Sequence, residues 1–125
     1  MQTDHEISIS VETSYLESQS APANNIFAFS YTINIMNSGK TAAKLLNRHW
    51  VITDANGKIQ EVRGEGVVGE QPHLQPGEAF RYTSGTLMAT PIGSMQGEYE
   101  MVDDNGDRFV APIPPFSLAR PHSLH

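Results

Sequence analysis

Apolar and polar residues alternate along several short stretches of this chain, and this alternation limits the fold more than any other feature of the sequence. The clearest stretch places five apolar residues on one parity: Phe27, Phe29, Tyr31, Ile33 and Ile35. Successive side chains of a β-strand point to opposite faces, so this stretch predicts a strand with one buried face. No segment keeps a helical period for longer than about 11 residues, the usual mean length of a helix. The chain is therefore predicted to be all-β.

The same alternation predicts further strands near residues 7–15, 46–54, 58–63, 80–84, 95–102 and 108–113. In the strand over 46–54, Leu46, Trp50 and Ile52 are expected to point inward. Trp50 is expected to lie in the core, where large aromatic side chains contribute most to stability.

Turn residues separate these strands. Asp54-Ala55-Asn56-Gly57 and the segment 103–107 predict two tight hairpins. Pro112, Pro114 and Pro115 restrict the C-terminal segment to an edge strand or extended chain, because proline has no N–H for a central ladder. About seven or eight short strands spaced in this way predict a β-sandwich of two antiparallel sheets with immunoglobulin or fibronectin type III-like topology.

Composition limits the number of domains and the class of partner. A chain of 125 residues suits one domain, here residues 1–125. We expect an ordered core over about 5–118 and flexible ends. With 14 acidic and 8 basic side chains the formal charge is −6, which disfavours nucleic acid and anionic membranes as partners. The chain has no Cys and no apolar run typical of a signal peptide or a membrane span, so we expect a cytoplasmic protein.

Gly64, Gly66 and Gly69 form a GxGxxG motif, which holds phosphates in nucleotide-binding proteins where a helix follows it. Here the following residues favour extended chain, and Pro72 would break a helix. One interpretation is that the glycines shape a turn between strands. The other is a nest of backbone N–H groups that binds a phosphate or another anion, with additional positive charge from Arg63.

Candidate metal ligands are few. Asp103, Asp104 and Asp107 could attract Mg²⁺ or Co²⁺ weakly through carboxylate oxygens, although a solvated hairpin tip is the preferred explanation of such a run. The five His residues are scattered, and His122 with His125 could bind a metal only if the tail were ordered. No nucleophile–base motif is present, so no catalytic residue is predicted.

Two further groups have alternative roles. Arg48 shares the parity of Trp50, so its guanidinium is expected to stack on an aromatic ring or to reach a carboxylate at the sheet edge. Tyr82, Tyr99 and Phe116 could form an exposed aromatic surface that contacts a partner.

Six motifs follow one another along the chain: Arg48-x-Trp50-x-Ile52-x-Asp54, Gly64-x-Gly66-Val67-Val68-Gly69, Pro72-x-Leu74-x-Pro76-Gly77, Phe80-x-Tyr82-x-Ser84-Gly85, Thr90-Pro91-x-Gly93-x-Met95-x-Gly97 and Ile113-Pro114-x-Phe116. With these motifs, from about Ile7 to Leu118, the chain resembles the ApaG family. The resemblance implies a fibronectin type III-like sandwich and a proposed pyrophosphate contact at the three motif glycines. It also implies a link, by name, to cobalt and magnesium efflux. Similar domains are attached to F-box and polymerase-interacting proteins.

These observations together predict a non-catalytic β-sandwich binding module that interacts with another protein, rather than an enzyme. The alternative is a small-ligand module that binds a phosphorylated nucleotide, pyrophosphate or divalent cation through the GxGxxG loop or the acidic hairpin. No cofactor is predicted beyond weak Mg²⁺ or Co²⁺ binding. Exposed edge strands would also allow a homodimer.

Overall fold

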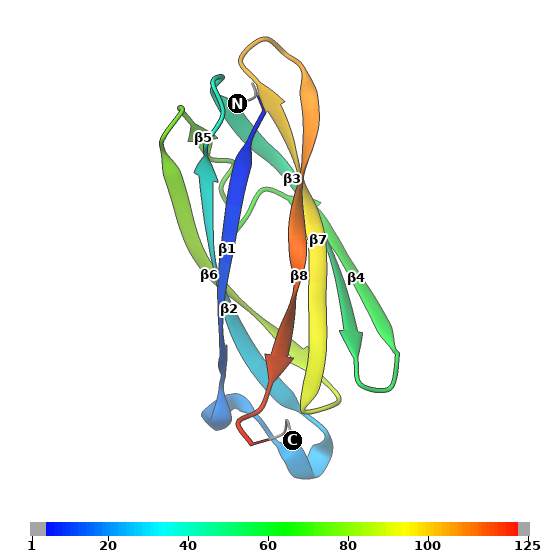
Figure 1. The fold of residues 1–125 in the computed structure, drawn as a ribbon. Helices are drawn as coiled ribbons and strands as arrows, with labels where there is room; N and C mark the ends of the chain where they lie inside the picture. The colour runs from blue at the N-terminus through cyan, green and yellow to red at the C-terminus, as the bar shows by residue number, and fades with distance from the viewer. Residues whose placement is uncertain (1–4, 123–125) are drawn as a thin grey trace.

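The computed structural model describes residues 5–122, which form a sandwich of two antiparallel sheets (Figure 1). The smaller sheet has three strands in the order β1-β2-β6: β1 Ile7–Tyr15, β2 Phe27–Asn37 and β6 Ala79–Met88. The larger sheet has five, in the order β4-β3-β7-β8 with β5 paired to β3: β3 Ala43–Asp54, β4 Ile59–Glu65, β5 His73–Leu74, β7 Ile92–Asp103 and β8 Arg108–Ala119.

Two short 3₁₀ helices, η1 Glu17–Gln19 and η2 Pro22–Asn24, lie in the connection between β1 and β2. Residues 5–122 contain no α-helix. The predicted all-β, immunoglobulin or fibronectin type III-like sandwich is therefore confirmed. Within the same residues, no helix has the length and apolar character needed to span a bilayer.

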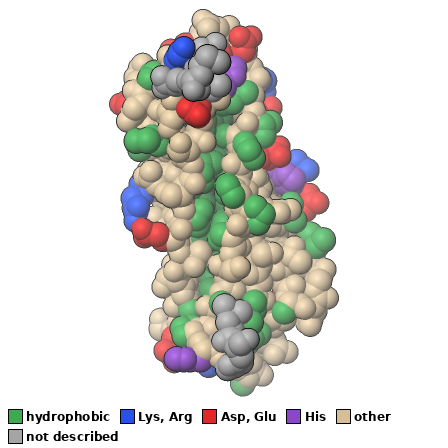
Figure 2. All heavy atoms as spheres, in the orientation of Figure 1, with side chains coloured by type: hydrophobic (Ala, Val, Ile, Leu, Met, Phe, Trp, Pro, Cys, Tyr) green, Lys and Arg blue, Asp and Glu red, His purple; other side chains and the backbone are tan. Residues whose placement is uncertain are grey.

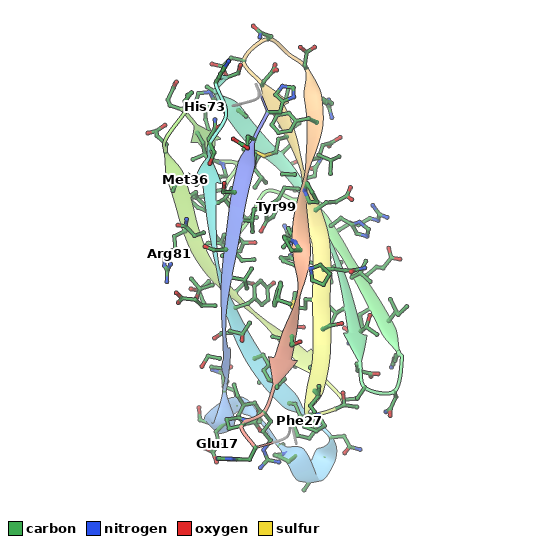
Figure 3. The ribbon with its side chains drawn as sticks, viewed as in Figure 1. Glu17, Phe27, Met36, His73, Arg81 and Tyr99 are labelled. Carbon is green, nitrogen blue, oxygen red and sulfur yellow. The ribbon has the colours of Figure 1, made fainter. Side chains whose placement is uncertain are left out.

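The core between the sheets is filled by the predicted inward parity. Trp50 is 2% exposed, and its ring contacts three others with centroids 5.4–6.4 Å apart: Tyr31, Tyr99 and Phe116. Figure 3 shows Tyr99 pointing between the two sheets, whereas Arg81 points outward from β6. The predicted core position of Trp50 is confirmed, and burial of such an aromatic side chain contributes about 3–5 kcal/mol of stability.

The predicted inward position of Leu46 is wrong. Leu45 is the fully buried residue, and Leu46 is only half-buried. A β-bulge between Leu45 and Asn47, in the pairing of β3 with β7, causes the difference. One extra residue in a strand reverses the faces of the side chains on either side of it. Trp50 and Ile52, beyond the bulge, keep their predicted orientation.

Both predicted hairpins are formed by the same local structure. In the β3–β4 turn, Oδ1 of Asp54 accepts hydrogen bonds from the N–H groups of Asn56 and Lys58. In the β7–β8 turn, Oδ1 of Asp103 accepts bonds from Asn105 N–H and Asp107 N–H. A glycine with positive φ completes each turn, Gly57 at 81° and Gly106 at 88°. This arrangement is a three-residue hairpin loop with Gly in the left-handed position.

β8 is the edge strand that its prolines predicted. It pairs only with β7, and the register shifts between Met95 and Gly97. Gly97 lies so close to the carbonyl of His49 on β3 that a Cβ atom could not fit there. The glycine therefore allows the backbones of β3 and β7 to approach each other closely at the bulge.

The two long sides of the sandwich differ. On one side β1 and β8 lie next to each other (Figure 1), and hydrophobic side chains follow the seam between them in Figure 2. On the other side the edge strands are β4 and β6, and the β3–β4 hairpin lies away from the smaller sheet in Figure 1. This second side carries the GxGxxG motif and the candidate site.

Candidate functional site

β4 is an unusually exposed strand. Six of its seven residues are exposed and Gly64 is half-buried. The exposed residues include two aliphatic side chains on opposite faces, Ile59 at 59% and Val62 at 38%. Sheet strands normally bury at least one face, so β4 presents a surface that the smaller sheet leaves uncovered.

β4 also presents unpaired backbone groups along its outer edge. Gly66 N–H donates to Leu46 C=O and Asp54 N–H donates to Lys58 C=O. These two bonds show which β4 residues direct their backbone groups toward β3. In an antiparallel pair, alternate residues direct N–H and C=O toward the partner and away from it. The N–H groups of Ile59, Glu61 and Arg63 therefore point outward, where no further strand pairs with β4 in the described part of the chain.

A two-residue turn follows β4 at residues 67–70. Val67 and Glu70 exchange both backbone hydrogen bonds, at 2.8 and 2.9 Å. The central residues, Val68 and Gly69, have φ of 43° and 82°, as in a type I′ turn. Asn or Gly is usual at the first of these positions, and a β-branched residue there is strained. Val68 is nevertheless present and is 53% exposed.

The three motif glycines have three different environments. Gly64 lies in β4, Gly66 has φ of 65° and its N–H is bonded to Leu46 C=O, and Gly69 lies in the type I′ turn. No helix follows Gly69 in the described residues. Of the loop amides, those of Gly66, Val67 and Glu70 already donate to backbone carbonyls.

Two cavities flank the Arg48 side chain, and neither is lined by all the predicted anion-binding residues; Gly66 lines neither of them. Arg63 and Gly64 line an outer hollow of about 510 Å³ on the solvent face of the larger sheet. Gly69 lines a smaller slot of about 160 Å³ between the sheets. A nest that includes Gly64, Gly66, Gly69 and Arg63 stays a prediction, and these residues do not line one cavity.

The outer hollow has charged groups of both signs. Its walls include three carboxylates and two guanidinium groups: Glu65, Glu98, Glu100, Arg48 and Arg63. Arg63 is 70% exposed there, and its nearest acidic partner is Glu61, with Nη2 and Oε2 3.6 Å apart. Carboxylates and guanidinium groups nearly balance in this hollow, so its charge does not favour an anion.

The inter-sheet slot has a different lining, with a single charged residue. Tyr31, Tyr82 and Ser84 come from the smaller sheet, Arg48 and Trp50 from β3, and the remaining wall is the turn at residues 67–69. Arg48 makes neither of its predicted contacts. Its Nη1 donates to the carbonyls of Glu65 and Gly66, at 3.1 and 2.9 Å, and none of the ion pairs among residues 5–122 includes Arg48.

The guanidinium of Arg48 also explains the first motif glycine. A Cβ placed on Gly64 would lie 2.6 Å from Nη2 and 2.7 Å from Cζ and Nη1. Three such nearly equal distances mean that the guanidinium lies over the Cα of Gly64. Gly64 therefore provides the space in which the Arg48 head group is positioned.

The predicted aromatic contact surface is wrong for two of its three members. Tyr82 is 7% exposed and Tyr99 is fully buried, while Phe116 is half-buried against the core. The two tyrosine hydroxyls bond to each other across the sandwich, 2.5 Å apart. Burial raises the pKa of Tyr82 to about 12, and burial also raises the pKa of Tyr99. Both hydroxyls therefore remain protonated at neutral pH.

Two of the three candidate metal ligands, Asp103 and Asp104, are used in structural contacts, whereas Asp107 contributes its backbone to the β7–β8 turn. Asp103 is 6% exposed; Oδ1 caps its hairpin, and Oδ2 lies 2.7 Å from Nε2 of His5. The hydrogen bond from His5 and those from the turn hold the pKa of the Asp103 carboxyl below its usual range. Asp104 pairs with His73 at 2.8 Å. Within residues 5–122, no three His, Asp or Glu side chains are grouped as a metal site, and His125 lies outside the described residues.

Comparisons with known proteins identify the family. A family model described as the ApaG domain matches residues 17–103. The chain belongs to the ApaG family. It is 58% identical to the ApaG protein of Acidithiobacillus ferrooxidans over 96% of this chain and 94% of the relative, and 55% identical to that of Ectopseudomonas mendocina over 97% and 96%. A crystal structure described as an ApaA protein from Bordetella pertussis superposes with a TM-score of 0.95 at 46% identity, covering 98% of this chain and all of that one. None of these ApaG-family names denotes an enzymatic activity.

Sequence reasoning missed two features of this ApaG-domain site. The position of Gly64 relative to Arg48 depends on strand pairing between residues 16 positions apart, which periodicity does not reveal. The strained turn at Val68 could have been predicted from local sequence. An aliphatic residue followed by Gly, between two strand-like segments, can form a type I′ turn with an unusual first residue.

Proposed function

We propose that this protein is a non-catalytic binding module that recruits a protein partner through the exposed edge formed by β4 and the 67–70 turn. The observation that carries the proposal is β4 itself, an edge strand exposed on both faces and, among residues 5–122, unpaired along its outer side. A partner strand can add to such an edge by backbone hydrogen bonds, with specificity from the alternating side chains.

The exposed aliphatic residues support the same surface. Ile59, Val62 and Val68 lie on β4 or on the turn that follows it, and each is at least 38% exposed. Val68 also keeps a left-handed conformation that Asn would adopt at lower cost. Backbone strain of this kind is concentrated at functional positions. A contact between the Val68 side chain and a partner gives a reason for retaining valine there.

A proline substitution in the outer edge of β4 tests this proposal. Arg63→Pro removes an N–H that points away from β3, so strand addition is blocked while the β3–β4 ladder is kept. Arg63→Ala is the matched control, because it removes the same side chain and keeps the N–H. Each chain would be expressed with an affinity tag in native cells, and co-purifying proteins would be quantified by mass spectrometry.

The expected result is a stoichiometric partner recovered with the unmodified chain and with Arg63→Ala, and lost with Arg63→Pro. Thermal unfolding should show that both variants are folded. Equal recovery of the partner with all three chains would rule out strand addition at β4. A homodimer is the other arrangement that this edge permits, and light scattering of the purified protein would detect it.

We also propose that the family's link by name to cobalt and magnesium efflux reaches this protein through its partner. This is supported by the structural use of Asp103 and Asp104 in contacts with His5 and His73. Calorimetric titration with Mg²⁺ and Co²⁺ should show binding no tighter than the millimolar range, as for exposed carboxylates. Sub-micromolar binding of either ion would contradict an indirect role.

A further inference from the structure

We propose that the inter-sheet slot between Arg48 and the 67–69 turn is a binding site for a small free organic carboxylate. The slot shares the 67–69 turn with the edge proposed for partner binding, but its charged group, Arg48, and its aromatic walls lie outside that edge, and the inference does not depend on the partner. It rests on the donors that one guanidinium lining the slot leaves available, the chemistry of the surrounding residues and the volume of the cavity.

The first argument is the set of donors that Arg48 leaves available. Both hydrogen bonds of its guanidinium come from Nη1, to the carbonyls of Glu65 and Gly66. A guanidinium has five N–H groups, of which Nε and Nη2 form a fork on one edge. Among residues 5–122, neither of these two nitrogens donates a hydrogen bond, and no carboxylate pairs with Arg48. The fork matches the two oxygens of a carboxylate.

The second argument is that the guanidinium is fixed in place. The two carbonyl bonds hold Nη1, and Gly64 lies beneath the plane of the group. Arginine on a protein surface normally loses side-chain entropy when it binds an anion, and this loss is reduced when the group is already positioned. Arg48 is only half-exposed, which also reduces the screening of its charge by water.

The third argument concerns the other walls of the slot. Apart from Arg48, the lining is uncharged: aromatic rings of Tyr31, Trp50 and Tyr82, the Ser84 hydroxyl, and the turn that contains Val68 and Gly69. One positive charge among aromatic and hydroxyl groups favours a monoanion with a short apolar stem. A phosphate dianion would leave one negative charge uncompensated in the same environment.

The volume limits the ligand. A slot of about 160 Å³ accommodates a carboxylate with a few carbon atoms. Sites for drug-sized ligands and cofactors are usually about 300–1,000 Å³, so a nucleotide does not fit in this space. This ligand class differs from the phosphorylated ligand that the GxGxxG motif suggests.

The test is a titration of the full chain, labelled with ¹⁵N, with acetate and propionate at constant ionic strength, followed by NMR. We expect saturable shifts of the Val68, Gly69 and Ser84 amides and of the Arg48 Nε–H. Inorganic phosphate, titrated in the same way, should bind more weakly than acetate. Tighter binding of phosphate, or no saturable shift with either carboxylate, would overturn the proposal.

Three variants identify the group responsible. Arg48→Gln removes the charge, and affinity for acetate should fall by about tenfold or more. Gly64→Ala keeps the charge but displaces the flexible head group of Arg48, and it should cause a similar loss even if Arg48→Gln is unstable. Arg81→Gln, an exposed arginine on the outer face of β6, is the matched control and should leave acetate affinity unchanged. Undiminished binding to folded Arg48→Gln or Gly64→Ala, or lost binding in Arg81→Gln, would exclude this slot.

Discussion

The hydroxyls of Tyr82 on β6 and Tyr99 on β7 are hydrogen-bonded at 2.5 Å, and they join the two sheets through the core. Each hydroxyl is the hydrogen-bond partner of the other, and both rings are buried. A buried hydroxyl that loses its partner incurs the cost of desolvation without compensation. The pair therefore makes the packing of the sheets depend on a specific polar contact as well as on apolar burial.

Tyr82→Phe should lower the free energy of unfolding by about 1–3 kcal/mol, because it leaves the Tyr99 hydroxyl without a partner. Urea unfolding followed by fluorescence measures this change. The double variant Tyr82→Phe/Tyr99→Phe removes both hydroxyls and should lose less than the sum of the single variants. Additive losses would mean that the bond makes no coupled contribution.

Stability should fall in alkaline solution because of the same pair. Burial raises the pKa of Tyr82 to about 12, above the ordinary value of 10.0 in the unfolded chain. Such a group contributes fully to stability below pH 10 and loses its contribution as pH rises toward 12. The loss from Tyr82 alone is about 2 kcal/mol near pH 11.5. Unfolding curves at pH 9 and about pH 11.5 should show this decrease, and the double Phe variant should show a smaller one.

Trp50→Ala tests the aromatic centre of the core. Trp50 is 2% exposed and contacts the rings of Tyr31, Tyr99 and Phe116. Removing a buried Trp side chain typically costs about 3–5 kcal/mol. Thermal unfolding should show a severe decrease in melting temperature, or a chain that no longer folds cooperatively. Phe116→Ala, at the half-buried edge of the core, should lower the melting temperature less. An unchanged melting temperature in Trp50→Ala would contradict this description of the core.

The fold was predictable from sequence because its signals are local. Strand parity at residues 27–35 and the Asp-capped hairpins at Asp54 and Asp103 depend on neighbouring residues, and the structure has both. Leu46 was assigned to the wrong face because a bulge breaks parity, and the bulge depends on the partner strand β7. Periodicity within one strand does not contain that information.

The candidate site was less predictable because it is assembled by strand pairing. The sequence motif joins Gly64, Gly66 and Gly69, but pairing of β4 with β3 places Gly64 next to Arg48 and leaves Gly69 in a turn. The sequence alone allows Tyr82 and Tyr99 to form an exposed aromatic surface, whereas the strand order of the two sheets directs their side chains into the core. Alternating sequence patterns identify faces but not which strands become neighbours.

The two Asp-capped hairpins should differ in their contribution to stability. Asp54→Ala removes two hydrogen bonds to the backbone of its turn and should cost about 1 kcal/mol. Asp103→Ala removes two such bonds and also the contact with His5, so its urea midpoint should fall further. The pKa of Asp103 is lowered, chiefly by the His5 hydrogen bond, so its contribution is present above pH 3.8 and is lost as pH falls below that value. Asp104→Ala, which removes only an exposed pair with His73, is the control and should change little.

Val68 offers a test of strain retained at a functional surface. Its φ of 43° is unfavourable for a β-branched residue, and its side chain is 53% exposed. Val68→Asn creates the Asn-Gly pair that type I′ turns prefer, so the free energy of unfolding should rise by about 1 kcal/mol. Gly69→Ala, which introduces a Cβ at φ of 82°, should instead lower it. If Val68 contacts a partner as proposed, Val68→Asn should bind that partner more weakly although it is the more stable chain. Increased stability with undiminished partner binding would remove Val68 from the interface, and decreased stability would contradict the strain itself.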